Sequence, residues 1–268
     1  MTHQSLAVYD NPMPNEPPLS ISGTGLTYES YLKIDALLSL QQPRSQPAEH
    51  DEMLFIVIHQ VYELWFKQVL HELGRIEESF LRVDAQAALG TFKRILTILK
   101  TLVAQVDVLE SMTPIEFSSF RKRLESASGF QSLQFRLIEI KLGKRDPRVI
   151  AHFGQDPAVH ARLLGALAQP PLYERFLRFL AASGVPVGED SAAALISVYR
   201  TQPTLAAVCE RMVDLDEGLQ EWRYRHVKMV ERTIGMLPGT GGSAGAAYVR
   251  TTLSAPLFPE LWAIRSQL

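Results

Sequence analysis

The sequence predicts an all-α fold, and three observations support this prediction. Apolar residues recur at spacings of three and four residues over long stretches, as on the buried face of a helix. We find no six-residue run that alternates between apolar and polar residues, which a half-buried strand would show. Glycine and proline stand mainly where the helical periodicity stops. We therefore expect a helical bundle with long central helices.

The N-terminal part should differ from the rest of the chain. Residues 1–25 carry four prolines among polar residues, a composition that cannot form a packed core, so we expect a flexible arm. A short amphipathic helix capped by Thr27 is predicted over residues 26–40. Residues 26–268 are predicted to form a single domain, which is long enough to bury a stable core.

The central helix is predicted over residues 51–80, where the helical repeat of apolar residues covers much of the circumference. At a rise of about 1.5 Å per residue it would span roughly 45 Å, so we expect it in the middle of the bundle. His59 lies within this apolar surface and shares a helix face with Phe55 and Tyr62. A lone histidine there is more often a core residue with a satisfied hydrogen bond than a chemical group.

Further helices follow in order along the chain. A second long helix is predicted over residues 85–112. Thr113 and Glu116 have the spacing of a capping box, with proline at the first helical position between them, so another helix should begin there. The remaining predicted helices cover residues 130–142, 147–154, 157–168, 171–183, 190–200 and 203–235.

Composition and charge exclude several classes of protein. The formal charge of −2 and the pI near 6.4 give no reason to expect nucleic acid or an anionic membrane surface as a partner. The single cysteine, Cys209, excludes an internal disulfide and a cysteine-based zinc cluster, and we expect it to be a small buried residue. We find neither a signal-peptide pattern nor 18 consecutive apolar residues, so we expect a cytoplasmic protein without a membrane span.

A second histidine in apolar surroundings lies late in the last long helix. His226 has Trp222 four residues before it and Met229 three residues after it, so its imidazole should also emerge among apolar groups. Facing helices of a bundle are where cofactors and metals are held. Two histidines without a third ligand make a poor zinc site, whereas one axial histidine suffices for haem iron. From these residues alone, two structural histidines remain the commoner interpretation.

The glycine-rich segment 239–245 resembles two well-known sites but fits neither. A phosphate-binding P-loop would need Lys followed by Ser or Thr after the last glycine. The GxSxG pattern around Ser243 would need a strand before it and a histidine after it to form a serine hydrolase site, and no histidine follows. We expect either a loop that closes over a site or a simple turn.

Arg121 lies on the helix predicted to begin after Thr113. Its guanidinium could bind a carboxylate through two parallel hydrogen bonds. The alternative is a solvated basic face shared with Lys122 and Arg123.

Taken together, these segments resemble the tryptophan 2,3-dioxygenase family. The resemblance covers most of residues 26–264 in the family's order. The segments that carry it are residues 50–67, 117–121, 128–136, 222–226, 234–235 and 239–245, together with 26–32 and 258–262. It implies an all-helical enzyme that binds one haem b per subunit and assembles as a homotetramer. Such an enzyme inserts O2 into L-tryptophan and forms N-formyl-L-kynurenine.

The resemblance also implies roles for single residues. His226 would be the proximal iron ligand, and His59 the distal, catalytic histidine that faces the indole N–H. Arg121 would bind the substrate carboxylate, and Thr240 would help to bind the ammonium and carboxylate groups. The other implied site residues are Phe55 and Phe117 in the indole pocket, Ser128 and Gly129 beside the haem, and Tyr28 and Tyr31, which match positions that reach a neighbouring subunit's site.

The chain departs from the family pattern in a few places. It is shorter between Thr204 and Trp222, Glu221 stands where an apolar residue is usual, and Ala244 replaces a serine. A shortened, specialised member could instead insert a single oxygen into tryptophan or a substituted tryptophan, giving a 2-oxindole. From a different class, a helical scaffold that binds haem or tryptophan without turnover is the other alternative.

Overall fold

The computed structural model describes residues 25–268 except 152, 189–190, 241–249, 252 and 254. Within these residues the regular structure is entirely helical and no strand occurs, which confirms the predicted fold class. Contacts divide the chain into two units, Met1–Leu40 and Gln41–Leu268. The predicted flexible arm lies almost wholly outside the described residues, so the predicted division into an arm and one domain stays a prediction.

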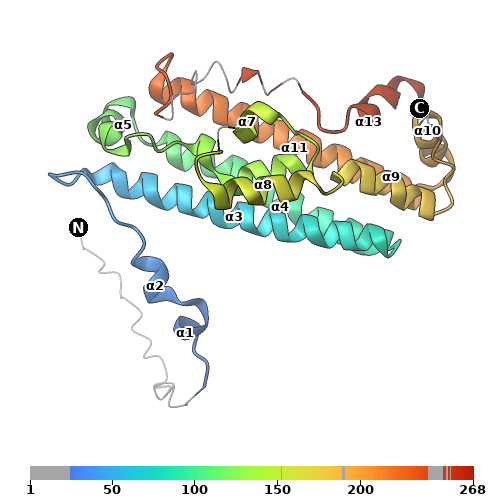
Figure 1. The fold of residues 1–268 in the computed structure, drawn as a ribbon, viewed down its shortest axis with the longest axis horizontal. Coiled ribbons are helices and arrows are strands. Elements are labelled where there is room, and N and C mark those ends of the chain that lie inside the picture. Colours follow the sequence, from blue (N-terminus) through green and yellow to red (C-terminus); the bar gives the residue numbers. More distant parts are fainter. Residues whose placement is uncertain (1–24, 152, 189–190, 241–249, 252, 254) are drawn as a thin grey trace, which may run out of the picture. The chain divides into compact units, whose positions relative to one another are not determined.

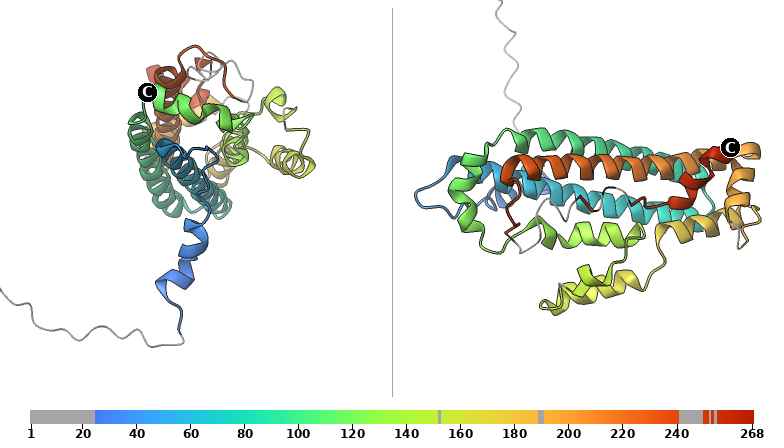
Figure 2. Two further views of the ribbon diagram at one scale, coloured as in Figure 1. Left: turned by 90° about the vertical axis from the view of Figure 1, so that its left-hand side faces the viewer. Right: turned by 90° about the horizontal axis from the view of Figure 1, so that it is seen from above.

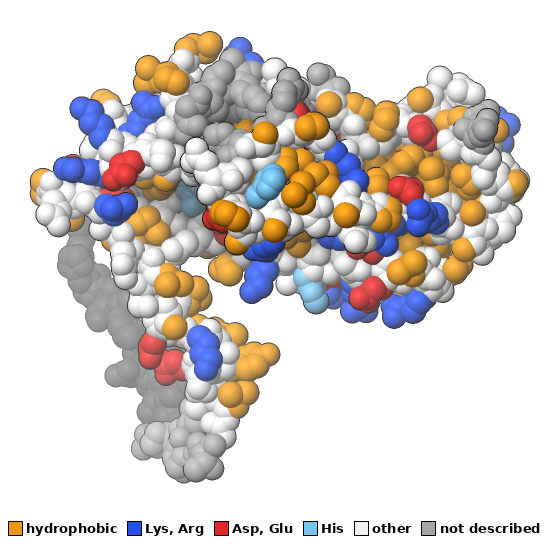
Figure 3. Space-filling view, in the orientation of Figure 1, with side chains coloured by type: hydrophobic (Ala, Val, Ile, Leu, Met, Phe, Trp, Pro, Cys, Tyr) orange, Lys and Arg blue, Asp and Glu red, His pale blue; other side chains and the backbone are white. Residues whose placement is uncertain are grey.

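The first unit contains two short helices, α1 (Tyr28–Leu32) and α2 (Ile34–Leu38). Thr27 caps α1 as predicted, because its hydroxyl accepts a hydrogen bond from the backbone N–H of Ser30 at 3.1 Å. The single helix predicted over 26–40 is wrong, because Lys33 takes a left-handed conformation (φ 56°, ψ 44°) that ends α1. In its described part, large apolar side chains between residues 26 and 40 are exposed, as the orange surface around α1 and α2 shows (Figure 3).

Three long helices form the centre of the second unit: α3 (His50–Leu81), α4 (Ala85–Glu110) and α11 (Pro203–Ile234). They run side by side, and α4 packs against both α3 and α11 (Figures 1 and 2). Their bounds confirm the predicted long helices to within a few residues. The sequence also explains their ends, since Asp84 accepts a hydrogen bond from the N–H of Ala87 at the start of α4.

Shorter helices cover these three. In chain order they are α5 (Pro114–Arg121), η1 (Lys122–Leu124), η2 (Gly129–Gln131), α6 (Leu133–Lys141), α7 (Pro147–Ala151), α8 (Pro157–Leu167), α9 (Leu172–Ala182), α10 (Ser191–Thr201), α13 (Pro259–Ala263) and η3 (Ile264–Gln267). α6 and α9 pack against α3, and α8 packs against α6. The helix predicted to resume at residue 130 begins instead at Leu133, because Ser128 and Ser132 each cap a separate turn.

A buried carboxylate holds the C-terminal segment on α11. Asp216 is fully buried and accepts hydrogen bonds from the N–H groups of Leu257 and Phe258, at 2.8 and 3.1 Å, and from the indole N–H of Trp262 at 3.0 Å. A buried charge needs such donors to offset its lost hydration. The described C-terminal residues are thereby tied to the same helix that carries His226.

Two sequence expectations can be compared with the fold. Cys209 is fully buried in α11 and unpaired, as predicted. Among the described helices, none combines the length and apolar character needed to cross a bilayer.

Candidate functional site

A cavity of about 310 Å³ opens among α3, α4, α5, α6 and α11, and most of its lining is apolar. It is the place where the predicted site residues meet. The predicted residues in its lining are Phe55, His59, Phe117, Arg121, Ser128, Gly129, His226 and Thr240. Tyr28 and Tyr31 belong instead to the N-terminal unit, where both side chains are exposed.

His59 is held by its own helix. Its Nδ1 lies 2.7 Å from the carbonyl oxygen of Phe55, and because a carbonyl only accepts, Nδ1 must carry the proton. Nε2 is then the acceptor nitrogen of a ring that lines the cavity. Burial lowers the pKa of His59, although the Phe55 carbonyl and the Glu63 carboxylate oppose this effect. His59 is therefore a neutral hydrogen-bond acceptor near pH 7.

Aromatic rings from α3 and α5 surround His59. The ring centroid of Phe55 lies 4.1 Å from that of His59, 5.7 Å from that of Phe117 and 5.6 Å from that of Phe120. Phe120 is fully buried and meets Phe117 edge to face. We call these four residues the aromatic wall. An aromatic pocket of this kind suits an aromatic ring system.

Arg121 and Thr240 link the segment after α11 to the end of α5 and to the connection between α5 and α6. Nη2 of Arg121 donates to the carbonyl of Pro238 at 2.6 Å, and the Thr240 hydroxyl donates to the carbonyl of Ala127 at 2.5 Å. Arg121 thus lines the cavity instead of belonging only to a solvated basic face. Of the predicted glycine-rich loop, Gly239 and Thr240 are described and border the cavity, and the rest lies outside the described residues.

His226 borders the cavity from α11. Its ring stacks on Trp222, with centroids 5.4 Å apart and ring planes 11° apart. Burial, with smaller contributions from His59 and Arg136, lowers the pKa of His226 to about 4, so its imidazole is neutral near pH 7. Within the described chain, no group of three or more His, Cys, Asp or Glu could hold a metal ion. The neutral imidazole of His226 is the kind of single ligand that haem iron takes from a protein.

Charged side chains of α6 and α11 form another part of the lining. Glu139 accepts from Nη1 of Arg136 at 2.5 Å and from Nη2 of Arg223 at 3.1 Å, and all three side chains are buried. We call Arg136, Glu139 and Arg223 the ionic wall. Sequence reasoning missed this role, because buried charges have no periodicity and Glu139 and Arg223 are 84 residues apart.

Two further residues of the His59 face line the cavity: Tyr62, which was predicted to share that face, and Glu63, which helical spacing could also have identified. Tyr62 and Glu63 follow His59 by three and four residues, so they share its helix face. The carboxylate of Glu63 accepts from Nε2 of Gln134 at 2.8 Å, which ties this face of α3 to α6.

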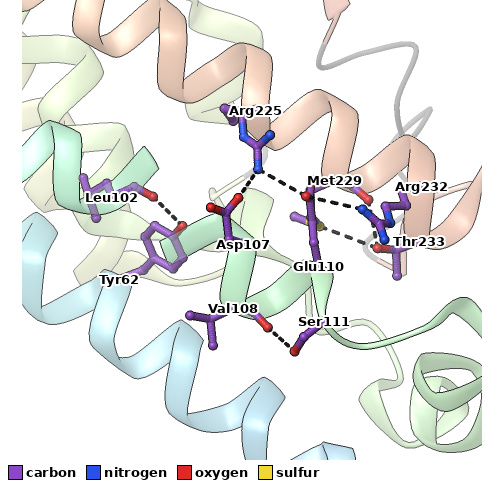
Figure 4. Close-up of polar contacts among 10 residues, drawn as sticks. All are labelled: Tyr62, Leu102, Asp107, Val108, Glu110, Ser111, Arg225, Met229, Arg232 and Thr233. Carbon is purple, nitrogen blue, oxygen red and sulfur yellow. Dashed lines mark hydrogen bonds and ion pairs between the residues drawn. The ribbon is translucent and has the colours of Figure 1, made fainter. Parts of the chain in front are cut away.

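Polar contacts between the long helices set the rotation of α11 (Figure 4). Arg225 donates to Asp107 at 2.5 Å and to Glu110 at 3.1 Å, both on α4. The Tyr62 hydroxyl donates to the carbonyl of Leu102 at 2.8 Å and joins α3 to α4. The residue after Arg225 is the histidine that lines the cavity, so these contacts hold the part of α11 that carries it against α4.

Comparison with known proteins agrees with this geometry. The family profile described as tryptophan 2,3-dioxygenase matches residues 14–161 and 186–268, well over half of the chain. The tryptophan 2,3-dioxygenase of Anaeromyxobacter sp. (strain K) is 57% identical over 263 residues, which cover 93% of this chain and 98% of the relative. That of Herpetosiphon aurantiacus is 56% identical over 258 residues, covering 91% and 98%.

A more distant relative extends the pattern. The tryptophan 2,3-dioxygenase of Nocardioides sp. is 45% identical over 256 residues, which cover 92% of this chain and 96% of the relative. Because so little of these relatives remains unmatched, the short region near residues 204–222 does not set the chain apart from them. The chain belongs to the tryptophan 2,3-dioxygenase family.

Proposed function

We propose that the chain is a haem-dependent oxygenase that inserts both atoms of O2 into the indole ring of L-tryptophan and forms N-formyl-L-kynurenine. The observation that carries this proposal is the meeting of two neutral histidines, the aromatic wall and Arg121 at one cavity. The relatives are named for dioxygenation, which favours this outcome over insertion of a single oxygen.

The residues at the cavity fit haem b. His226 would ligate the iron through its neutral imidazole, and Ser128 and Gly129 would border the porphyrin. A side chain added at Gly129 would meet nothing within 4 Å, so the backbone there leaves open space. When bound, haem supplies the binding and activation of O2. We propose one haem for each subunit.

The protein's own residues would bind and orient the substrate. The aromatic wall takes the indole ring, and Nε2 of His59 accepts a hydrogen bond from the indole N–H. Arg121 binds the substrate carboxylate through charge-assisted hydrogen bonds, and Thr240 donates to the same end of the molecule. A neutral His59 positions the ring without removing a proton from it.

We also propose a homotetramer, in which Tyr28 and Tyr31 reach the site of a neighbouring subunit. Support comes from the N-terminal unit, where the side chains of Tyr28 and Tyr31 are 78% and 68% exposed. Large exposed apolar groups mark association surfaces. The cytoplasmic location stays a prediction.

Spectroscopy and mass spectrometry test the proposed reaction. The purified ferrous protein should show a Soret band, and with L-tryptophan and ¹⁸O2 it should form a product that has gained two labelled oxygens. A gain of one labelled oxygen would establish the 2-oxindole alternative instead. Bound haem and tryptophan without any product would identify a binding protein.

A further inference from the structure

We infer that the ionic wall is a carboxylate-binding site for the cofactor, where Arg136 donates to a haem propionate and Glu139 positions Arg136 and Arg223 for it. This inference rests on the proposed function, because haem is the ligand. Glu139 does not touch the ligand and is a positioning residue.

The first argument concerns charge. Arg136, Glu139 and Arg223 are only 8%, 4% and 3% exposed, and Lys144 also contacts Glu139, at 3.2 Å. Three cations thus share one buried carboxylate, and buried charges are stable only when they are paired. Asp216 contributes a second favourable charge to Arg223, whereas the carboxylate in contact with Arg136 is that of Glu139.

The surroundings of Lys144 differ from those of Arg136. Lys144 and Asp146 border a second, small pocket together with Arg136 and Glu139, and neither Lys144 nor Asp146 lines the main cavity. Arg136 shares Glu139 with Arg223 and Lys144 and also lines the main cavity, so an anion bound in the cavity would give its guanidinium a further partner.

The second argument concerns a donor. Nε of Arg136 is buried and has no hydrogen-bond partner within the described residues, whereas Nη1 is bound to Glu139. The guanidinium also lies 5.1 and 5.0 Å from the ring centroids of Phe130 and Phe135, which fix its plane. A fixed guanidinium with a donor to spare is suited to a carboxylate.

The third argument identifies the ligand. An amino acid substrate has one carboxylate, and we assign that carboxylate to Arg121 and Thr240. These two residues hydrogen-bond to Pro238 and Ala127, not to members of the ionic wall. Haem b carries two propionates. Arg136 and the proposed iron ligand His226 line the same cavity, so both can reach one bound haem.

Release of haem from the ferric holoprotein to an excess of a haem-scavenging globin tests the inference. The probes are haem b and its dimethyl ester, in which both propionate charges are removed. The wild-type protein should release the ester about 10- to 100-fold faster than haem b, the scale expected for one hydrogen bond to a charged group. The Arg136→Leu protein should release haem b as fast as it releases the ester.

Further variants separate the roles within the cluster. Glu139→Gln should speed haem b release less than Arg136→Leu does, because the arginines stay but lose their fixed orientation. Arg136→Lys should restore part of the discrimination, since it restores the charge without the planar donor. Lys144→Met is the matched control, because it removes a cation from Glu139 outside the main cavity and should keep the wild-type discrimination. Thermal unfolding of each apoprotein checks that the variants fold.

Two results would overturn the inference. One is equal release of haem b and the ester from the wild-type protein, which needs no variant. The other is wild-type discrimination in a folded Arg136→Leu protein. If the wild-type protein takes up neither porphyrin, the proposed function itself fails, and that outcome is distinct from the first two.

Discussion

The aromatic wall and the ionic wall line one cavity but are held together by different physics. In the aromatic wall, the ring centroids of the three phenylalanines of α3 and α5 lie 5.4 to 5.7 Å apart. Its one polar side chain, His59, is hydrogen-bonded to the backbone of its own helix. In the ionic wall, charges from α6 and α11 meet at Glu139. Trimming a packed ring lowers stability by an amount that grows with the buried apolar volume removed. Removing one member of a buried ion pair instead leaves the charge of its partner uncompensated. We therefore expect substitutions in the aromatic wall to change substrate binding by graded amounts. Substitutions on the α6–α11 side should decide whether the cofactor binds.

The largest effect should come from His226→Ala on the cofactor side. The change removes the proposed iron ligand, so the purified protein should contain almost no haem and show no Soret band. Added imidazole should restore part of the band by occupying the vacated space. Full haem occupancy without imidazole would show that another residue holds the iron.

Arg121→Leu should have the next largest effect, on the substrate side. Loss of charge-assisted hydrogen bonds to the carboxylate should lower kcat/KM for L-tryptophan about 10- to 100-fold. The same change should leave kcat/KM for tryptamine, which has no carboxylate, almost unaltered. Lys122→Met is the matched control on the neighbouring exposed residue. An equal loss with both substrates would contradict carboxylate binding by Arg121.

His59→Phe should have a smaller effect, since it keeps a ring against Phe55 while removing the acceptor Nε2 and the Nδ1–H bond to the Phe55 carbonyl. We expect kcat/KM for L-tryptophan to fall about tenfold, the scale of one hydrogen bond. The wild-type enzyme should discriminate against 1-methyltryptophan, which lacks the indole N–H, and the variant should not. Retained discrimination would mean that His59 does not contact the indole nitrogen.

The ion pairs between α4 and α11 should contribute less, and their contributions to the free energy of unfolding should differ with burial. Arg225→Gln should lower the free energy of unfolding by about 1 kcal/mol, because the side chain of Glu110 is only 13% exposed and would lose a partner. Asp107→Asn, at a side chain that is 75% exposed, should have almost no effect. Urea unfolding of the apoproteins measures both, and equal losses would show that burial does not decide the value of these pairs.

Glu52 is a buried carboxylate that, within the described residues, is held by hydroxyl and backbone N–H donors, in contrast to Glu139, which is held by cations. Burial acts to raise the pKa of Glu52, but hydrogen bonds from the Ser45 hydroxyl and from the backbone of Arg44 and Ser45 outweigh it, and the pKa is lowered from 4.5. The unfolded state therefore binds more protons, and the stabilisation is present above pH 4.5 and lost as the pH falls through the folded-state pKa.

Glu52→Gln should accordingly weaken the dependence of stability on pH below 4.5. Urea unfolding in a series of acidic buffers measures this slope for both proteins. An unchanged slope would show that other carboxylates account for the acid sensitivity.

Prediction from the sequence succeeded where the determinant was local or was a set of neighbouring residues. The helical periodicity of α3, α4 and α11 appears in the order of residues, because each turn brings residues three and four apart to one face. Thr27 and Thr113 cap helices as predicted, because a cap involves residues only three apart. The roles of His59, Arg121 and His226 came from resemblance to a family, and their meeting at one cavity agrees with those roles.

The sequence alone thus determined the fold class, the long helices and the family of this protein. Only the tertiary structure decided which charges are buried together, as in the ionic wall, and which carbonyl Arg121 contacts. The physical reason is that apolar burial leaves a periodic signal along one helix, whereas an ion pair depends on where two distant helices meet and in which rotation. Arg136, Glu139 and Arg223 became a candidate site once α6 and α11 were brought to the same cavity.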